Sequence, residues 1–336
     1  MRAWRVEERF GLDRLRLVEL PDPSPGPGEL LLRVRAVSLN YRDLMMIDGR
    51  YNPRQPLPLV PCSDGAGEVV AVGEGVAGWR AGDRACPIFA PRWLAGAPDR
   101  ERLRATLGGP LDGTLRELMT VPAESVVRVP PGLDDVEAAT LPCAAVTAWC
   151  ALVRQGAVRA GQSVLVLGTG GVALFALQIA RLHGARVLVT SSSDEKLARA
   201  RALGAAVGIN YRDEPAWGRR ARELAGEGVD HVVEVGGAGT LAESMRAVRP
   251  GGTIHLIGVL ASGEAPLSIV PVFMSQLRVQ GVLVGPREAF EELVTAFELN
   301  AVRPVVDSVF AFEEAPAAFA HLAAGAHFGK VCVRVG

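Results

Sequence analysis

Three small residues, Gly168, Gly170 and Ala173, form a G-x-G-x-x-A pattern at the end of an apolar run, SVLVLG, and at the start of a helical pattern. The first glycine permits a tight turn, the second lets backbone N–H groups approach a pyrophosphate, and the small third residue lets helix and strand pack closely. A glycine-rich turn without a ligand is the alternative, but the strand, helix and following strand that the pattern requires are all present. The sequence therefore predicts a dinucleotide site that includes Gly168, Thr169, Gly170, Gly171 and Val172.

The second strand of this pattern ends in hydroxyl side chains. Sites for NAD place Asp or Glu there, about 20 residues after the fingerprint, to hold the ribose hydroxyls. This chain has Thr190 and three serines at 191–193, followed by Lys196. Because hydroxyls and an ammonium group can bind a 2′-phosphate, we expect NADPH as the cofactor, with Ser191 and Lys196 among its ligands, and NADH as the less favoured one. The alternative is that the serines cap the next helix and Lys196 is solvated; both interpretations can hold together.

The elements around the fingerprint alternate between strand and helix. From Ser163 onward, buried strand patterns such as ARVLVTS and GVDHVVEVG are separated by helical patterns such as SDEKLARARALG. Such alternation predicts an α/β domain with a doubly wound parallel sheet, the Rossmann fold. A long apolar helical segment precedes it, with N-cap chemistry at Asp134 and Asp135. We place this domain at 125–286, ending in the strand LRVQGVLVG at 277–285.

The N-terminal part, 1–124, has short apolar runs separated by Pro and Gly clusters, which is typical of strands and turns. We expect a partly open β-barrel there, with its clearest strands at 30–40 and 65–73. Residues 91–110 are rich in Arg, Gly and Pro and predict a surface loop with one helical turn at 99–107. The last segment, 287–336, predicts two short helices and a strand that complete this first domain.

The composition fits a globular protein of two domains. The 336 residues exceed one ordinary core, since a domain usually holds roughly 100 to 200 residues. A net charge of −1 provides no basic surface for nucleic acid. The N-terminal residues carry charges where a signal peptide needs an apolar run, no segment approaches a membrane span, and the five cysteines are scattered. We therefore expect a soluble cytoplasmic protein without disulfides, membrane segments or nucleic-acid partners.

Six segments together resemble a known family: LNYRDLMMIDGRY, PCSDGAGEVVAVGEGV, AGDRA, LPCAAVTAW, VLGTGGVAL and HFGKV. In this order, and over nearly the whole chain, they resemble the zinc-free quinone oxidoreductase and enone reductase branch of the medium-chain dehydrogenases/reductases. The resemblance implies a GroES-like catalytic domain and a Rossmann cofactor domain. It also implies an NADPH-dependent, zinc-independent oxidoreductase that transfers hydride to an α,β-unsaturated carbonyl or a quinone. Two alternatives stay open, an NADP(H)-dependent alcohol or aldehyde dehydrogenase and a non-catalytic nucleotide-binding scaffold.

The resemblance also bears on zinc. In the zinc alcohol dehydrogenases that share this fold, a cysteine ligand stands where this chain has Asn40, and a G-H-E triplet stands where it has Cys62, Ser63 and Asp64. Cys143 matches the third ligand position. A catalytic zinc needs three N, S or O protein ligands, and Cys143 with a serine and an asparagine would be a poor set. We expect no catalytic zinc, with Cys143 as a small buried residue, and no structural zinc because its lobe is missing.

Further cofactor contacts are implied by the resemblance. Lys196 and Tyr211 match residues that hold the 2′-phosphate in NADPH-dependent relatives, although a half-exposed loop aromatic is the alternative for Tyr211. Other matching positions line the cofactor through their backbone: Gly236, Gly258, Val259, Leu283 and Val284. Lys330 is a further candidate contact.

The family's acceptor pocket corresponds to Asn40, Tyr41, Asp43 and Tyr51. An enolate or a hydroquinone anion delocalises its charge, so hydrogen-bond donors such as an Asn amide or a Tyr hydroxyl can stabilise it without a metal. The alternative is that Asn40 and Asp43 fix a turn and that Tyr41 faces solvent. The histidines show no paired metal spacing. The family pairs subunits through the edge strand equivalent to 277–285, so we also expect a homodimer.

Overall fold

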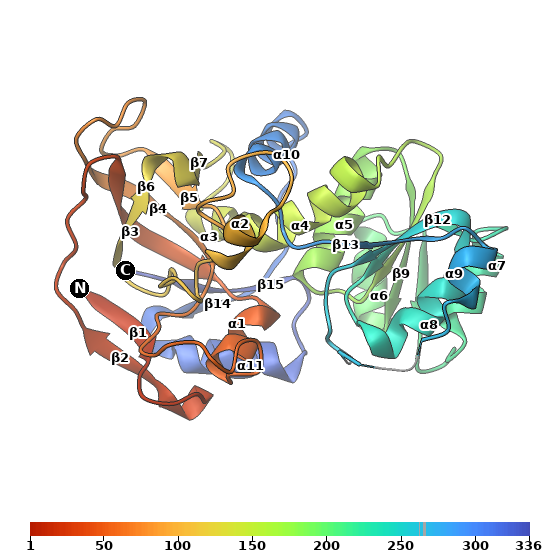
Figure 1. Cartoon of the computed structure of the whole chain (residues 1–336). Coiled ribbons are helices and arrows are strands. Elements are labelled where there is room, and N and C mark those ends of the chain that lie inside the picture. Colours follow the sequence, from red (N-terminus) through yellow and green to blue (C-terminus); the bar gives the residue numbers. More distant parts are fainter. Residues whose placement is uncertain (262, 265–266) are drawn as a thin grey trace. The chain divides into compact units, whose positions relative to one another are not determined.

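The computed structural model describes residues 1–261, 263–264 and 267–336, and the chain divides into two compact units (Figure 1). The first unit holds Met1–Val146 and Gly285–Gly336, and the second holds Thr147–Val284. The first unit thus extends beyond the predicted boundary at 124. Two sets of contacts keep this part of the chain in the first unit: β7 (Val126–Arg128) forms an antiparallel pair with β5 (Arg84–Pro87), and α3 (Asp135–Ala139) packs against β3 (Glu29–Ser38) and β4 (Asp64–Val72).

The first unit is built on a seven-stranded sheet. Its strand order is β14-β15-β3-β4-β5-β7, and β6 also pairs with β3. The described strands at the two ends of this path, β14 and β7, do not pair with each other, so the barrel is partly open as predicted. The remaining strands are β1 (Arg2–Val6) and β2 (Leu15–Glu19), which pair with each other, β3 (Glu29–Ser38), β4 (Asp64–Val72), β6 (Leu118–Pro122), β14 (Val306–Ala311) and β15 (Lys330–Arg334).

Apolar residues of β3 form the centre of the first unit's core. Leu30, Leu32 and Val34 are buried, and residues between them are more exposed, as expected for a strand with one buried face. The α-helices of the first unit are α1 (Tyr41–Ile47), α2 (Arg100–Arg104), α3 (Asp135–Ala139), α10 (Arg287–Leu299) and α11 (Ala315–Ala324). Helix α2 is shorter than the predicted turn at 99–107. The C-terminal segment contains a second strand, β14, which we did not predict because its residues are mostly half-exposed and lack a clear alternation.

The second unit is a six-stranded parallel sheet with the order β10-β9-β8-β11-β12-β13. If these six strands are numbered 1 to 6 in sequence order, their order across the sheet is 3-2-1-4-5-6, which is the order of the Rossmann fold. The strands are β8 (Ser163–Leu167), β9 (Arg186–Ser191), β10 (Val207–Asn210), β11 (Val229–Glu234), β12 (Val248–Leu256) and β13 (Arg278–Gly281). The helices between them are α5 (Gly171–Leu182), α6 (Asp194–Ala202), α7 (Trp217–Leu224), α8 (Ala238–Ala247) and α9 (Val270–Met274).

Two predicted boundaries differ from the structure. Strand β13 ends at Gly281, so the predicted strand at 277–285 is shorter than expected. The long helical segment after Asp134 is interrupted: α3 is followed by the π-helical segment η3 (Leu141–Ala145), by α4 (Val146–Trp149) and by the π-helical segment η4 (Cys150–Gln155). Pro142 lies at the start of η3 and has no N–H to continue the α-helical hydrogen bonds. No helix in the described part of the chain is both long and apolar enough to cross a membrane.

Candidate functional site

The fingerprint glycines form an open turn between β8 and α5. Gly168 has a φ of +77°, a conformation that favours glycine, and its N–H donates to Thr190 O at 2.9 Å. Gly170 is the N-cap of α5. A methyl group added at either glycine would meet no other atom within 4 Å. The space over the N-terminus of α5 is therefore open, and the first-turn N–H groups and the helix dipole favour an anion there.

Apart from Lys196, which lies in the first turn of α6, the cofactor residues predicted in the second unit lie at or just after the carboxyl ends of the parallel strands. The strand order reverses between β8 and β11, and ligands of such sheets bind outside the carboxyl ends at that reversal. The placements are Gly168 after β8, Ser191 at the end of β9, Tyr211 after β10, Gly236 after β11, Gly258 and Val259 after β12, and Leu283 and Val284 after β13.

The end of β9 presents hydroxyl groups and no carboxylate. Thr190 and Ser191 are its last residues, and both are buried. Ser193 caps α6 by accepting a hydrogen bond from Lys196 N–H at 3.3 Å, so the capping alternative describes Ser193 correctly. Ser193 N–H in turn donates to Ser191 Oγ at 3.2 Å. Tyr211 is 43% exposed and its N–H donates to Ser191 O at 3.1 Å.

Glu234, at the end of β11, is a buried residue that the sequence analysis did not single out. Its Oε1 accepts hydrogen bonds from the N–H groups of Gly236 and Gly237 at 2.7 and 3.0 Å, and from Thr240 Oγ1 at 2.6 Å. The N–H of Gly236 is therefore engaged within the fold. A carboxylate followed by two glycines and then by hydroxyl residues is the sequence signal that could have predicted this cap.

In the first unit, three neighbouring strands bring the other predicted residues together. Ser38, at the end of β3, pairs with Asp64 of β4 on one side and with Cys332 of β15 on the other. Asn40 follows β3, and Lys330 begins β15. Residues far apart in the sequence therefore meet at one end of these strands.

Lys330 is directed at Asn40. Its Nζ donates to Asn40 Oδ1 at 2.6 Å and to Leu39 O at 2.8 Å, and the residue is only 3% exposed. An ammonium group donates only, so the amide atom that it contacts is the oxygen. The Asn40 Nδ2 is buried and makes no short hydrogen bond within the described residues; its nearest acceptor is the carboxylate of Asp64, whose pKa the Asn40 side chain lowers. The structure thus places Lys330 as a partner of Asn40.

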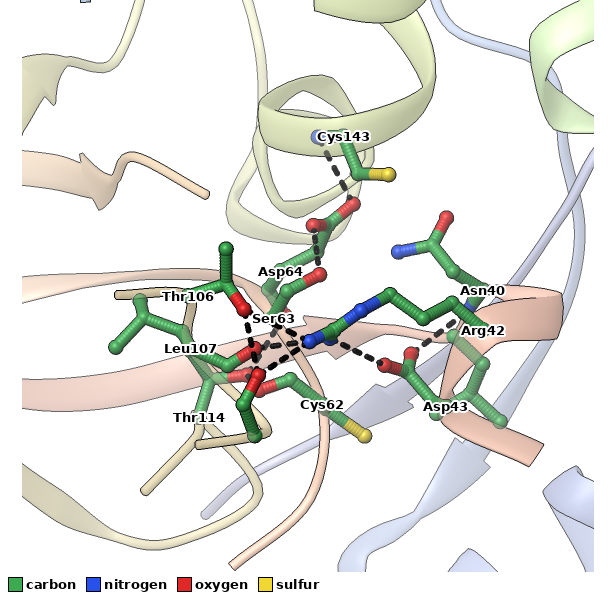
Figure 2. Close-up of polar contacts among 12 residues, drawn as sticks. Asn40, Arg42, Asp43, Cys62, Ser63, Asp64, Thr106, Leu107, Thr114 and Cys143 are labelled. Atoms are coloured by element: carbon green, nitrogen blue, oxygen red, sulfur yellow. Dashed lines mark hydrogen bonds and ion pairs between the residues drawn. The ribbon is translucent and has the colours of Figure 1, made fainter. Parts of the chain in front are cut away.

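Asp64 is fully buried beside this pair. Its Oδ1 accepts from Ser63 Oγ at 2.7 Å and its Oδ2 accepts from Cys143 N–H at 3.2 Å (Figure 2). Burial raises the pKa of Asp64, and the charge of Lys330 and the side chains of Asn40 and Ser63 oppose the rise. Cys143 is half-exposed, not buried as expected, and its thiol pKa is raised by desolvation and by the charge of Asp64.

Asp43 and Arg42 hold the start of α1. The fully buried Asp43 accepts a hydrogen bond from Asn40 N–H at 2.8 Å through Oδ2, and burial, opposed by Arg42, raises the pKa of Asp43 to about 6. The Arg42 guanidinium donates to Leu107 O and Thr106 Oγ1 (Figure 2). The turn-fixing alternative thus describes Asp43 and the backbone of Asn40, whereas the Asn40 side chain turns to Lys330.

The two predicted tyrosines have different surroundings. The ring of Tyr51 lies 5.0 Å from the Arg42 guanidinium, and Tyr51 is 46% exposed. Tyr41 is half-buried and packs against the first unit's core, so only part of this side chain faces solvent. Among the described residues, no group of three or more His, Cys, Asp or Glu side chains is arranged to hold a metal ion.

Comparison with known proteins decides the family. The family model described as the alcohol dehydrogenase GroES-like domain matches residues 26–131, and the one described as zinc-binding dehydrogenase matches residues 171–298. A zinc-type alcohol dehydrogenase-like protein of Schizosaccharomyces pombe is 42% identical over 337 residues, covering 98% of this chain and 97% of that protein. The chain belongs to the medium-chain dehydrogenase/reductase superfamily. The predicted fold class, a GroES-like domain with a Rossmann domain, is confirmed.

Other relatives of this medium-chain dehydrogenase/reductase carry different activities. A candidate alcohol dehydrogenase from Sinorhizobium meliloti 1021 has a solved structure that is 46% identical with a TM-score of 0.93, covering 99% of this chain and 98% of that one. The acryloyl-coenzyme A reductase of Metallosphaera sedula is 31% identical, covering 93% of this chain and 94% of that protein. The medium-chain dehydrogenase/reductase described here is accordingly an NAD(P)H-dependent oxidoreductase.

Proposed function

We propose that this medium-chain dehydrogenase/reductase uses NADPH to reduce α,β-unsaturated carbonyl compounds or quinones, and that it does so without a catalytic zinc. The observation that carries the proposal is the state of Asn40, which stands where zinc alcohol dehydrogenases have a cysteine ligand. Its amide oxygen is held by Lys330 at 2.6 Å, and its amide nitrogen lies near the Asp64 carboxylate without forming a short hydrogen bond within the described residues. In the proposal this nitrogen turns to the acceptor oxygen when a substrate is bound, which satisfies a buried donor.

The residues at the zinc-ligand positions do not fit a zinc ion. Metal ligands must be deprotonated and must direct a free electron pair at the ion. Ser63 donates its hydroxyl to Asp64, and the oxygen of Asn40 is taken by Lys330. This donor set favours a metal-free reaction.

The chemistry follows from the donor at Asn40. NADPH, when bound, supplies a hydride ion to the β-carbon of an enone or to a quinone. The electron pair of the reduced double bond moves onto the acceptor oxygen, giving an enolate or a hydroquinone anion, which then takes one proton from water. The N–H groups of Asn40 donate to that oxygen as its charge develops, and Asp43 fixes the backbone of Asn40 through its carboxylate.

The preference for NADPH is supported by the end of β9. No carboxylate stands at Thr190 or Ser191, where NAD sites place an acid to hold the ribose. In the proposal Ser191, Lys196 and Tyr211 hold the 2′-phosphate, and the turn from Gly168 to Val172 holds the pyrophosphate at the N-terminus of α5. Gly258, Val259, Leu283 and Val284 line the rest of the cofactor. Gly236 contacts the cofactor through atoms other than its N–H, which donates to Glu234. Lys330 acts on Asn40 instead of on the cofactor.

Two alternatives are tested together with the proposal. The names of the relatives from Schizosaccharomyces pombe and Sinorhizobium meliloti favour alcohol chemistry, whereas the acryloyl-coenzyme A reductase is a precedent for reducing a conjugated carbonyl. A scaffold would bind NADPH and turn over nothing. Steady-state rates should be measured with NADPH on 1,4-naphthoquinone and a 2-alkenal, with NADP⁺ on a simple alcohol, and on protein whose zinc content is known.

We expect turnover of the enal or the quinone by zinc-free protein, and little turnover of the alcohol. Alcohol oxidation that appears only when zinc is added would favour the alcohol dehydrogenase, and NADPH binding without any turnover would favour the scaffold.

We also propose a cytoplasmic homodimer. Strand β13 is an edge of the parallel sheet, and such edges pair readily with a second copy. Apolar side chains on and beside α9 are exposed, among them Ile269 (67%), Phe273 (60%) and Met274 (72%). None of the five cysteines, all of which lie in the described part of the chain, forms a disulfide, as suits a reducing compartment. Light scattering coupled to size-exclusion chromatography tests the dimer; a monomer at all concentrations would contradict it.

A further inference from the structure

We propose that Lys330 is a positioning residue for Asn40: its ammonium group sets which end of the Asn40 amide faces the acceptor and strengthens the amide N–H groups as donors. The inference rests on the proposed function, because it assumes that Asn40 donates to the acceptor oxygen. It assigns to Lys330 a part in catalysis that involves no contact with the cofactor or the substrate.

The two ends of an amide group are nearly the same in shape but opposite in hydrogen bonding, since the oxygen accepts and the NH₂ group donates. Lys330 Nζ lies 2.6 Å from Asn40 Oδ1 and 2.8 Å from Leu39 O. If the amide were rotated by 180°, its NH₂ group would face a buried ammonium group, donor against donor. Lys330 therefore keeps the oxygen inward, and the nitrogen, which lies near the Asp64 carboxylate, is the end that can donate to a substrate.

The same contact polarises the amide. A hydrogen bond from a charged donor is stronger than a neutral one, and a chain of hydrogen bonds strengthens each member by polarisation. Electron density drawn toward the Asn40 oxygen makes its N–H groups more acidic and better donors to a developing oxyanion. The fixed positive charge behind the amide thus acts on the acceptor through Asn40.

The ammonium is held rigidly in place. Lys330 N–H donates to Val305 O at 3.0 Å, and Asp307 accepts a hydrogen bond from Phe328 N–H at 2.9 Å. Gly329, between Phe328 and Lys330, has a φ of +97°, and a methyl group there would approach Val305 O to 2.3 Å. These hydrogen bonds and the close approach at Gly329 constrain the turn before β15, which positions the base of the lysine side chain.

The choice of lysine at this position is also informative. Of the 36 Lys and Arg residues in the chain, only Lys196 and Lys330 are lysines, and both are in the candidate sites. Lysine supplies a compact charge with three donors, whereas the planar guanidinium of arginine presents a wide fork. Leu39 O and Asn40 Oδ1 both accept from the same nitrogen. This arrangement suits the compact ammonium group.

A double-mutant cycle tests the inference. We expect Lys330→Met to lower kcat on the accepted enone roughly 10- to 100-fold, the effect of losing one charged hydrogen bond, and to leave the Kd for NADPH unchanged. Asn40→Ala should lower kcat at least as much. The double variant should be no slower than Asn40→Ala, because Lys330 acts through Asn40. Independent, multiplicative losses in the double variant would overturn the inference, as would a weaker NADPH affinity in Lys330→Met.

A second set of variants separates positioning from charge balance, since Lys330 also offsets the buried charge of Asp64. If charge balance were its only task, Asp64→Asn would restore the activity of Lys330→Met. We expect no such rescue from Asp64→Asn, and partial activity in Lys330→Arg, which keeps donors near the amide. Full recovery in the Lys330→Met/Asp64→Asn protein would overturn the inference.

A spectroscopic measurement tests the inference without any measurement of turnover. The chain has four asparagines, Asn40, Asn52, Asn210 and Asn300, so the side-chain amide signals of ¹⁵N-asparagine-labelled protein are few, and Asn40→Ala identifies the one sought. We expect that signal to shift in Lys330→Met while the other three stay in place. If the wild type reduces no acceptor, the proposed function fails, and an unshifted Asn40 signal would separately overturn the role of Lys330.

Discussion

The imidazole rings of His231 and His255 stack within the parallel sheet of the second unit, with centroids 5.5 Å apart and planes inclined by 22°. A ring nitrogen of each lies 3.3 Å from the other, and His231 also lies 3.3 Å from Gln162 Oε1. One ring must donate and the other accept, so at least one nitrogen of the pair is unprotonated. Both rings are buried, which makes protonation of the pair costly.

This pair predicts a loss of stability in acid. Burial, His231 and Arg278 lower the pKa of His255 from 6.5 to about 3, so the unfolded chain binds a proton that the folded chain does not. The contribution of neutral His255 to the free energy of unfolding is therefore complete above about pH 6.5 and is lost as the pH falls toward 3. By linkage the loss is about 2 kcal/mol at pH 5. Urea unfolding at pH 7.5 and pH 5 measures it; an equally steep loss in His255→Asn would contradict this origin.

The fingerprint glycines should separate stability from binding. Gly170 has an ordinary negative φ of −81° and open space around it, so Gly170→Ala should change the free energy of unfolding by less than about 0.5 kcal/mol. The added methyl group occupies space that a pyrophosphate needs, so the Kd for NADPH should rise about tenfold or more. Fluorescence titration and urea unfolding measure the two effects.

Gly168→Ala is the matched control for the effect on folding stability. Its φ of +77° makes any side chain there cost about 1 kcal/mol of folding stability. Stable Gly170→Ala protein that binds NADPH as tightly as the wild type would show that no pyrophosphate lies over this turn.

Lys196 should determine which nucleotide binds. Removal of a charged partner of the 2′-phosphate costs roughly 1.5–3 kcal/mol, so Lys196→Ala should weaken NADPH binding roughly 10- to 100-fold and leave NADH binding unchanged. Arg199→Ala, an exposed change on the same helix α6, serves as the control and should affect neither. Equal weakening of both nucleotides by Lys196→Ala would place its action away from the 2′-phosphate.

Tyr51 should be less important for turnover than Asn40. Its ring lies over the Arg42 guanidinium at 5.0 Å, an interaction that phenylalanine keeps. We expect Tyr51→Phe to keep kcat within about twofold and Asn40→Ala to lower it about 100-fold or more, as for an oxyanion donor. A large loss in Tyr51→Phe with wild-type stability would make its hydroxyl the principal donor. Unchanged turnover in both variants would remove both residues from the mechanism.

The second unit could be predicted from the sequence largely because its signals are local. Gly168, Gly170 and the flanking strand and helix lie within one short segment, and in a parallel sheet all carboxyl ends fall on one edge. The cofactor residues were therefore predicted at positions that the fold places at that edge. The shortness of β13 was missed because an apolar run does not show where pairing stops.

The arrangement around Asn40 could not be predicted in the same way. Lys330 and Asn40 are 290 residues apart, and only the pairing of β3 with β15 brings them together. A capping role for Asn40 follows from local preference, but the fold directs its side chain to Lys330 and leaves the cap to Asp43. Strand β14 was missed for a related reason, since its residues show no buried alternation.

Deuterium transfer from the cofactor shows which carbon of an unsaturated carbonyl compound receives the hydride. The protein should be supplied with NADPH carrying deuterium at C4 of the nicotinamide and with a 2-alkenal, and the product should be analysed by mass spectrometry and NMR. We expect a saturated aldehyde with one deuterium at the β-carbon, formed by zinc-free protein. An allylic alcohol with deuterium at the former carbonyl carbon would contradict it, because the hydride would then have reduced the carbonyl group itself.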